Sequence, residues 1–281
     1  MGPGKLKYAI ILLIVCSTVG GMLTLFFQRF ISFSAPPQPL AALAVPASAS
    51  PGGIAIYNPP TPQDAPPDLR EAVLLGFNLM NDTGKYASAY VGNSLRCSNC
   101  HLKAGLSRGG KNGGISLVGI GATYPQYRKR QEFSVHLVTR TNDCFKRSMN
   151  GRPLAEDSRE MTGLLTYYQW ISRGIPVYSV VPWLGLKKIK NSHPPDAIAG
   201  KDLYAAKCVA CHGGNGEGTN AAPALWGEKS FNDGAGMVQA DNFAAFAHDN
   251  MPLGNPDLSE EQSLDAAVFV TSRPRPHFMK H

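Results

Sequence analysis

The chain has 281 residues, of which 43% are hydrophobic and 17% charged, a composition typical of a folded protein and not of a disordered one. The net charge of +7 is unevenly distributed, because residues 63–195 carry 18 positive and 9 negative side chains whereas residues 196–281 carry 6 and 11. This asymmetry predicts two domains with different partners. No aromatic-and-basic ladder or zinc-finger spacing accompanies the positive charge, which argues against nucleic acid as a partner.

Residues 8–27 form an uncharged and largely apolar run of 20 residues. A helix of this length crosses a bilayer core of ~30 Å at ~1.5 Å per residue. Lys5 and Lys7 precede the run and Arg29 follows it, which favours a cytoplasmic N-terminus and an exported body. Residues 1–34 are therefore predicted to be a retained membrane anchor, with the protein on the periplasmic face of the bacterial inner membrane. A cleaved signal peptide, which would leave a free periplasmic protein, is the alternative.

Residues 35–67 are rich in proline, alanine and serine, in stretches such as "APPQPLAALAVPASASPGG" and "NPPTPQDAPP". This composition predicts an extended tether without a core of its own. The segment "DLREAVLLGFNLM" follows and has the apolar pattern of a helix. Asp68 and Glu71 stand at capping-box spacing at its start.

The strongest signal in the sequence is "CSNCH", which returns as "CVACH". Cys-x-x-Cys-His is the attachment signature of a c-type haem, in which both thiols bond to the porphyrin and the histidine ligates the iron. A single zinc site would need two cysteine pairs 107 residues apart, and a thioredoxin-like redox pair lacks its βαβ setting. Two covalently attached haems are therefore predicted, bound by Cys97, Cys100 and His101 and by Cys208, Cys211 and His212.

Each motif lies between two predicted helices. After the first motif, Ser158 is the expected N-cap of a helix with one apolar face. The second motif follows "DAIAGKDLYAAK" and precedes "SEEQSLDAAVFVTS", in which Ser259 and Gln262 form a capping box. The order helix, haem motif, long loop, helix is that of a class I cytochrome c domain. The sequence thus predicts a mostly α protein with two such domains in tandem, 68–193 and 194–281, behind the anchor and the tether.

The stretch "GLSRGGKN", from Gly105 to Asn112, nearly matches a phosphate-binding P-loop. It ends in asparagine and follows a haem motif instead of a strand, so the required context is missing. The interpretation is a flexible loop beside the first haem.

Each haem iron needs a ligand opposite its histidine. In the second domain "NMPLG" offers Met251, with His248 and Met237 as rivals. In the first domain the candidates are His136, Cys144 and Met149. Seven positive and two negative side chains lie between residues 128 and 152, and such a field favours a thiolate at Cys144 over a plain buried thiol.

The segments "YPQYRKRQ", "RTNDCFKRSMNG" and "MTGLLTYYQWIS", together with the two haem motifs, resemble the dihaem thiosulfate dehydrogenases. The resemblance implies His101 and Cys144 as ligands of the active-site haem iron, and His212 and Met251 as ligands of the electron-exit haem iron. It places Arg140 and Ser148 in the substrate pocket. Some members have an exchangeable lysine before the second-haem methionine; this chain has Asn250 there, which predicts permanent ligation by Met251.

The resemblance implies that the protein couples two thiosulfate ions to tetrathionate, and some relatives run the reverse reduction. The hypothesis is that Cys144 leaves the iron and engages a sulfane sulfur while each haem takes one electron. A soluble or membrane cytochrome c would then accept the electrons from the acidic second domain. Two alternatives remain: a tethered dihaem electron carrier without catalysis, and the haem-thiolate subunit of a sulfur-oxidising complex that attaches thiosulfate to a partner's cysteine.

Overall fold

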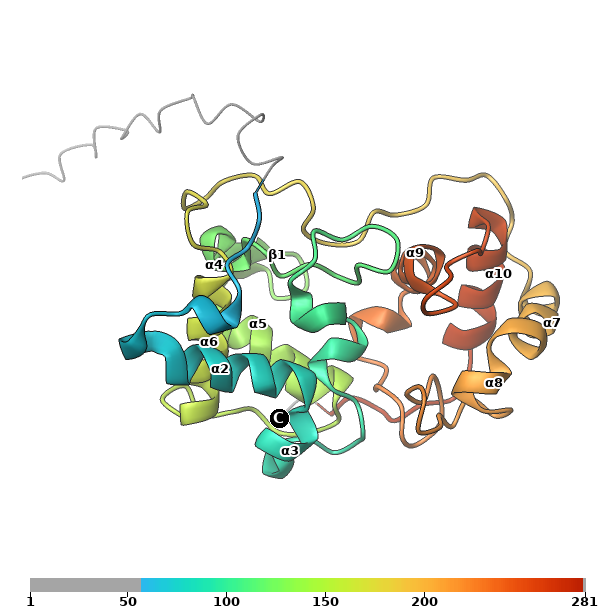
Figure 1. The fold of residues 1–281 in the computed structure, drawn as a ribbon. Coiled ribbons are helices and arrows are strands. Elements are labelled where there is room, and N and C mark those ends of the chain that lie inside the picture. Colours follow the sequence, from blue (N-terminus) through green and yellow to red (C-terminus); the bar gives the residue numbers. More distant parts are fainter. Residues whose placement is uncertain (1–56, 280–281) are drawn as a thin grey trace, which may run out of the picture. The chain divides into compact units, whose positions relative to one another are not determined.

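The computed structural model describes residues 57–279, which fold mainly into helices (Figure 1). The α-helices are α2 (Pro67–Asn81), α3 (Thr83–Tyr86), α4 (Ile120–Thr123), α5 (Leu137–Asp143), α6 (Arg159–Trp170), α7 (Ala197–Lys207), α8 (Val209–His212), α9 (Ala240–Asn250) and α10 (Glu260–Thr271). The 3-10 helices are η1 (Pro62–Asp64), η2 (Ser88–Tyr90), η3 (Cys97–Asn99), η4 (Leu102–Gly105) and η6 (Gly236–Val238), and η5 (Cys144–Ser148) is π-helical. One antiparallel pair, β1 (Gln126–Arg128) and β2 (Phe133–Val135), is the sheet of the described part. The predicted mostly α architecture is confirmed.

In the first half of the described chain, α2 and α6 cross in close contact (Figure 1). The crossing depends on small residues, because a Cβ added to Gly76 would lie 2.2 Å from the carbonyl oxygen of Gly163. The core around this crossing includes the fully buried Tyr167, Leu79 and Met161. The two helices therefore approach backbone to backbone, and their larger side chains fill the space on either side.

The second half repeats this arrangement with α7 and α10. A Cβ on Gly200 of α7 would lie 2.0 Å from the carbonyl oxygen of Asp265 in α10. Tyr204, Trp226 and Phe269 pack their rings together beside the crossing, with centroids 4.9 to 5.7 Å apart. A pair of crossing terminal helices thus recurs in both halves, as the repeated sequence order predicts.

We expect Gly76→Ala to lower the free energy of unfolding by roughly 3 kcal/mol, because the new methyl group must force α2 away from α6. Thermal or chemical unfolding measures this effect. Gly84→Ala is the matched control, since Gly84 is exposed and a Cβ there meets nothing within 4 Å. Equal stabilities of the two variants would contradict the close crossing.

Most predicted helix starts are confirmed. The Ser158 side chain accepts a hydrogen bond from the backbone of Met161, and Ser259 and Gln262 form the expected reciprocal capping box. The capping box expected at Asp68 and Glu71 is wrong. Helix α2 begins at Pro67 with Pro66 as its N-cap, because a proline is favoured in the first turn, where its missing N–H costs no helical hydrogen bond.

The composition of residues 35–67 predicts an extended tether, but its described part, 57–67, is packed against the rest of the protein. Tyr57 stacks on Trp183, and its hydroxyl donates to the carbonyl oxygens of Ile171 and Arg173. Ala65 is fully buried. The composition signal fails here because a few anchoring side chains suffice to fix a proline-rich segment. The predicted anchor, 1–34, lies outside the described residues; within 57–279 no helix has the length and hydrophobicity to cross a membrane.

Candidate active site and haem-binding residues

A cavity of about 1400 Å³ is lined by both Cys-x-x-Cys-His motifs. The first motif enters it through η3 and the residues just after, and the second through the end of α7 and α8. In both motifs the histidine backbone N–H donates to the carbonyl oxygen of the first cysteine at 2.9 Å, which closes one helical turn. Because of this helical turn, the two thiols and the imidazole of each motif all face the cavity. The sequence prediction that each motif acts as a unit is consistent with this geometry.

The two histidines are oriented in the same way. Nδ1 of His101 lies 2.8 Å from the carbonyl oxygen of Ile115, and Nδ1 of His212 lies 2.8 Å from that of Pro223. A carbonyl accepts only from a protonated nitrogen, so each Nδ1 carries the hydrogen and each Nε2 is left unprotonated. Such outer hydrogen bonds fix the ring orientation of metal-ligating histidines. The donor sets in this cavity therefore fit two c-type haems.

Burial keeps these groups uncharged. It lowers the pKa of His101 to about 4, with the nearby Arg140 acting in the same direction, and it lowers the pKa of His212. Burial also raises the pKa of both Cys97 and Cys100 to about 12. Neutral imidazoles are the metal-binding form.

Cys144 stands where α5 passes into the π-helical turn η5. The wider turn is seen in the hydrogen bond from Met149 N–H to the Cys144 carbonyl oxygen, which spans five residues at 3.0 Å. Single π-turns inside helices occur frequently at functional sites. Cys144, Arg140 and Ser148 all line the cavity that His101 lines, so the structure brings the predicted catalytic residues together.

Arg140 lies one turn before Cys144 on α5 and donates from Nη1 to its Sγ at 2.9 Å. The pKa of Arg140 is raised, chiefly by the Cys144 sulfur, although burial acts in the opposite direction. The guanidinium is thus fixed against the sulfur by a charge-assisted hydrogen bond. The pair thus places a nucleophilic sulfur and a permanent positive charge side by side in the cavity wall.

The other charges of this region are partly neutralised. Asp143 accepts from Arg147 Nε at 3.2 Å and from Gln131 Nε2 at 2.7 Å. Arg147 also lies over the Phe278 ring at 4.1 Å. Lys146 is 3.9 Å from the same carboxylate. Arg140, which bonds the sulfur and not Asp143, is therefore the positive group closest to the predicted reaction centre.

Tyr124 is a site residue that sequence reasoning missed. It lines the cavity, and burial raises the pKa of its hydroxyl while Arg128 and Arg140 lower it. The residue opens "YPQYRKRQ", so the resemblance contained a signal for it, but its proximity to Arg140 depends on the fold. A tyrosine hydroxyl here adds a neutral polar group to the wall of the cavity that Cys144 also lines.

The rival ligands in the first domain differ in position. His136 is exposed and does not line the cavity, whereas Met149 lines it and is 2% exposed. In the second domain Met251 and Met237 both line the cavity. His248 does not, and its Nδ1 lies 3.0 Å from the Leu258 carbonyl oxygen. The geometry thus removes both histidines from the choice. It retains Cys144 and Met149 in the first domain and Met251 and Met237 in the second.

The second half of the chain supports the turn that contains Cys144. Asn232 donates from Nδ2 to the Lys146 carbonyl oxygen at 2.9 Å, and its backbone N–H donates to that of Arg147 at 3.1 Å. Asn150 donates to the Ser230 carbonyl oxygen at 2.7 Å. Hydrogen bonds from the second domain therefore support the π-turn. A local sequence pattern does not predict such bonds.

Comparison with known proteins agrees with this architecture. The SoxA/TsdA cytochrome c domain model matches residues 86–177, and the cytochrome c model matches residues 197–272. The chain is 38% identical over 249 residues to thiosulfate dehydrogenase from Allochromatium vinosum, covering 86% of this chain and 87% of that one. It is 37% identical over 263 residues to thiosulfate dehydrogenase from Thiomonas intermedia, covering 90% and 82%.

Among solved structures, the chain is similar to thiosulfate dehydrogenase (TsdBA) from Marichromatium purpuratum in its as-isolated form, with a TM-score of 0.73 and 29% identity. The match covers 78% of this chain and 50% of that protein, so this chain spans half of that relative's length. Two cytochrome c domains imply two c-type haems with iron. With its two haem motifs and the identities over most of its length, the chain belongs to the thiosulfate dehydrogenase family.

Proposed function

We propose that this protein oxidises thiosulfate and joins two thiosulfate ions into tetrathionate. The observation that supports this proposal most strongly is the 2.9 Å contact between Arg140 Nη1 and Cys144 Sγ in the cavity that both haem motifs line. A protein that only transfers electrons needs the haems but does not need a cysteine paired with an arginine in the cavity wall. The relatives named thiosulfate dehydrogenase agree with the proposed substrate.

The proposed iron ligands and haem-attachment residues are supported by their positions, because all of them line the same cavity. His101 and Cys144 would hold the iron of the first haem, and His212 and Met251 that of the second. Cys97 with Cys100, and Cys208 with Cys211, would attach the porphyrins. When bound, the haems supply two one-electron acceptors, and the neutral thioether of Met251 would give the second the higher potential.

The chemistry of the chain's own residues balances in two steps. The Cys144 thiolate bonds to the terminal sulfur of one thiosulfate, giving a cysteine S-thiosulfonate and releasing two electrons to the haems. The terminal sulfur of a second thiosulfate then attacks that sulfur, which forms tetrathionate and returns Cys144 as a thiolate. No proton is transferred in either step.

Arg140 would favour both steps electrostatically. Thiosulfate is a dianion, so two of these ions repel each other as their sulfurs approach. A partly buried guanidinium can donate to the sulfonate oxygens and offset that repulsion, because charge-assisted hydrogen bonds to anions are strong. Ser148, which lines the same cavity, would add a neutral donor.

We place the electron acceptor at the second domain. Residues 196–281 carry 11 acidic and 6 basic side chains, so a basic cytochrome c would be attracted to them. The proposed location is the periplasmic side of the bacterial inner membrane. Residues 8–27 would anchor the protein there, and the part that carries the haem motifs would be exported. The same couple run backwards would reduce tetrathionate.

The test is a stopped assay of the purified dihaem protein with thiosulfate and ferricyanide. We expect rapid bleaching, with one ferricyanide reduced per thiosulfate consumed and one tetrathionate formed per two thiosulfates. Inertness of the protein with both haems reducible by dithionite would support the electron carrier instead. Turnover that appears only with a cysteine-bearing partner protein would support the haem-thiolate subunit of a sulfur-oxidising complex.

A further inference from the structure

The glycine-rich loop 105–114 follows the first haem motif in the chain and contacts the second domain. It is not a phosphate-binding loop, and its glycines are used for backbone conformations that let it follow a tight path. Gly114 has a φ of +65°, and a Cβ there would lie 2.6 Å from the Leu102 backbone nitrogen. A side chain at position 114 would therefore collide with the backbone that follows the first haem motif.

Asn112, in this loop, forms hydrogen bonds to both ends of segment 249–254, which contains Met251. Asn112 N–H donates to the Asp249 carbonyl oxygen at 2.6 Å. The Asn112 side chain Oδ1 accepts from Gly254 N–H at 3.1 Å. One residue of the first domain thus bonds the chain two residues before Met251 and three residues after it. Asn112 has a φ of +54°, which asparagine tolerates better than most residues.

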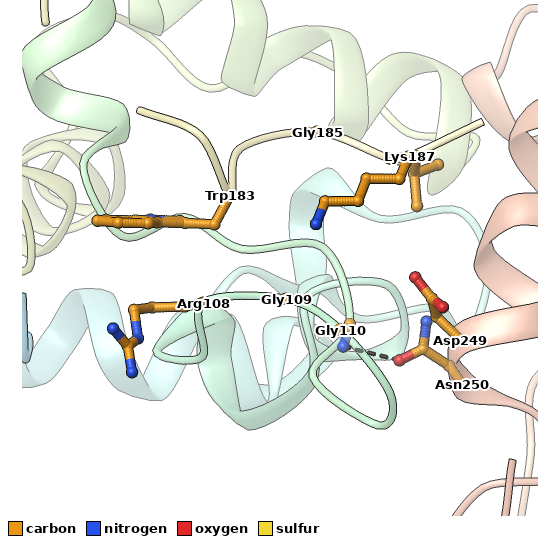
Figure 2. A pocket seen from close by; sticks show the side chains of 10 residues that line it. Arg108, Gly109, Gly110, Trp183, Gly185, Lys187, Asp249 and Asn250 are labelled. Atoms are coloured by element: carbon orange, nitrogen blue, oxygen red, sulfur yellow. Dashed lines mark hydrogen bonds between the residues drawn. The ribbon is translucent and has the colours of Figure 1, made fainter. Parts of the chain in front are cut away.

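Asn250, directly before Met251, makes the third bond (Figure 2). Its Oδ1 accepts from Gly114 N–H at 2.8 Å, and its Nδ2 donates to the Phe246 carbonyl oxygen at 2.9 Å. The side chain is 1% exposed, so each of these bonds is expensive to lose. Figure 2 shows Asp249 and Asn250 facing the loop that carries Gly109 and Gly110.

The other end of the loop bonds the first haem motif. Ile115, next to Gly114, donates from its N–H to the Cys100 carbonyl oxygen at 2.9 Å. Its own carbonyl oxygen is the acceptor for Nδ1 of His101 at 2.8 Å. Two adjacent residues, Gly114 and Ile115, therefore bond the residue before Met251 and the first haem motif, respectively.

We infer that loop 105–114 is an interdomain clamp, with Asn112 and Asn250 as positioning residues that hold Met251 against the second haem. The inference rests on the ligand pair His212 and Met251 proposed above. Without the clamp, segment 249–254 would have only its bonds within the second domain, and Met251 would leave the iron more often. In this role Asn250 positions Met251 by hydrogen bonds and does not itself bind the iron.

The test uses the near-infrared charge-transfer band of methionine-ligated ferric haem and the reduction potential of each haem, both measured on the purified dihaem protein. Asn250→Ala removes the bond to Gly114 together with the bond to Phe246, whereas Asn112→Gly removes only the bond to Gly254 and permits the positive φ. We expect a loss of band intensity and a lower potential of the second haem. The fraction of molecules without Met251 on iron should rise on the order of fivefold per bond removed. The first haem's potential should stay unchanged.

Two control variants separate positioning from general damage. Asn112→Asp keeps an acceptor for Gly254 N–H and should restore the band. Asn255→Ala alters an exposed side chain in the same turn and should behave like the unaltered protein. A full band and an unchanged second potential in both Asn112→Gly and Asn250→Ala would overturn the clamp. A missing band in the unaltered protein would overturn the proposed Met251 ligation, and the clamp with it, without affecting the thiosulfate assay.

Discussion

Cys144→Ala is expected to reduce thiosulfate-dependent ferricyanide reduction by about a thousandfold or more, the scale found when a covalent nucleophile is removed. The reason is that no other described thiol is free to bond the substrate sulfur, since the remaining four cysteines of residues 57–279 belong to the haem motifs. Both haems should remain attached, because their six attachment residues are untouched. Turnover is measured with the purified protein, and haem content by the absorbance of the reduced form.

Cys144→Ser sharpens this prediction. The hydroxyl can still accept a hydrogen bond from Arg140, so the local packing of α5 and η5 is preserved, but oxygen does not form the required bond to sulfane sulfur. We therefore expect the serine variant to be as inactive as the alanine variant. Near-normal turnover of either one would contradict the catalytic role of Cys144.

Arg140→Leu is expected to lower kcat/KM for thiosulfate by about 10² to 10³, the range found when one charge-stabilising donor is removed from an active site. Leucine fills similar space but leaves the dianion repulsion unopposed. Arg140→Lys should retain part of the activity, because lysine keeps the charge but lacks the planar fork that binds sulfonate oxygens. Steady-state kinetics at fixed ionic strength provide the measurement.

Arg152→Leu is the matched control for this substitution. Arg152 belongs to the same basic stretch, but it is exposed, lies over the Tyr90 ring at 4.8 Å and donates to the Ala89 carbonyl oxygen. Its loss changes the net charge equally without altering the cavity. If both leucine variants lost the same activity, general attraction of anions and not a specific contact at Cys144 would be responsible.

The haem motifs could be predicted from sequence because their chemistry is local. Two thiols three residues apart and a histidine directly after them fit within one helical turn, which the backbone bond from His101 to Cys97 shows. The helix caps at Ser158 and Ser259 were predictable for the same reason, since a cap needs only its own first turn. The cap at Asp68 was not, because two competing prolines lie just before it.

The sequence alone determined which residues can react: two haem attachment motifs, one further thiol among basic residues, and a methionine followed by proline. Only the tertiary structure decided which of them share a cavity and what holds them there. The tie from Asn250 to Gly114 joins residues 136 positions apart, and that from Gly254 to Asn112 joins residues 142 apart. Such pairings are selected by packing of the whole chain, because a backbone N–H can bond any acceptor that the fold presents, and no local pattern specifies which one.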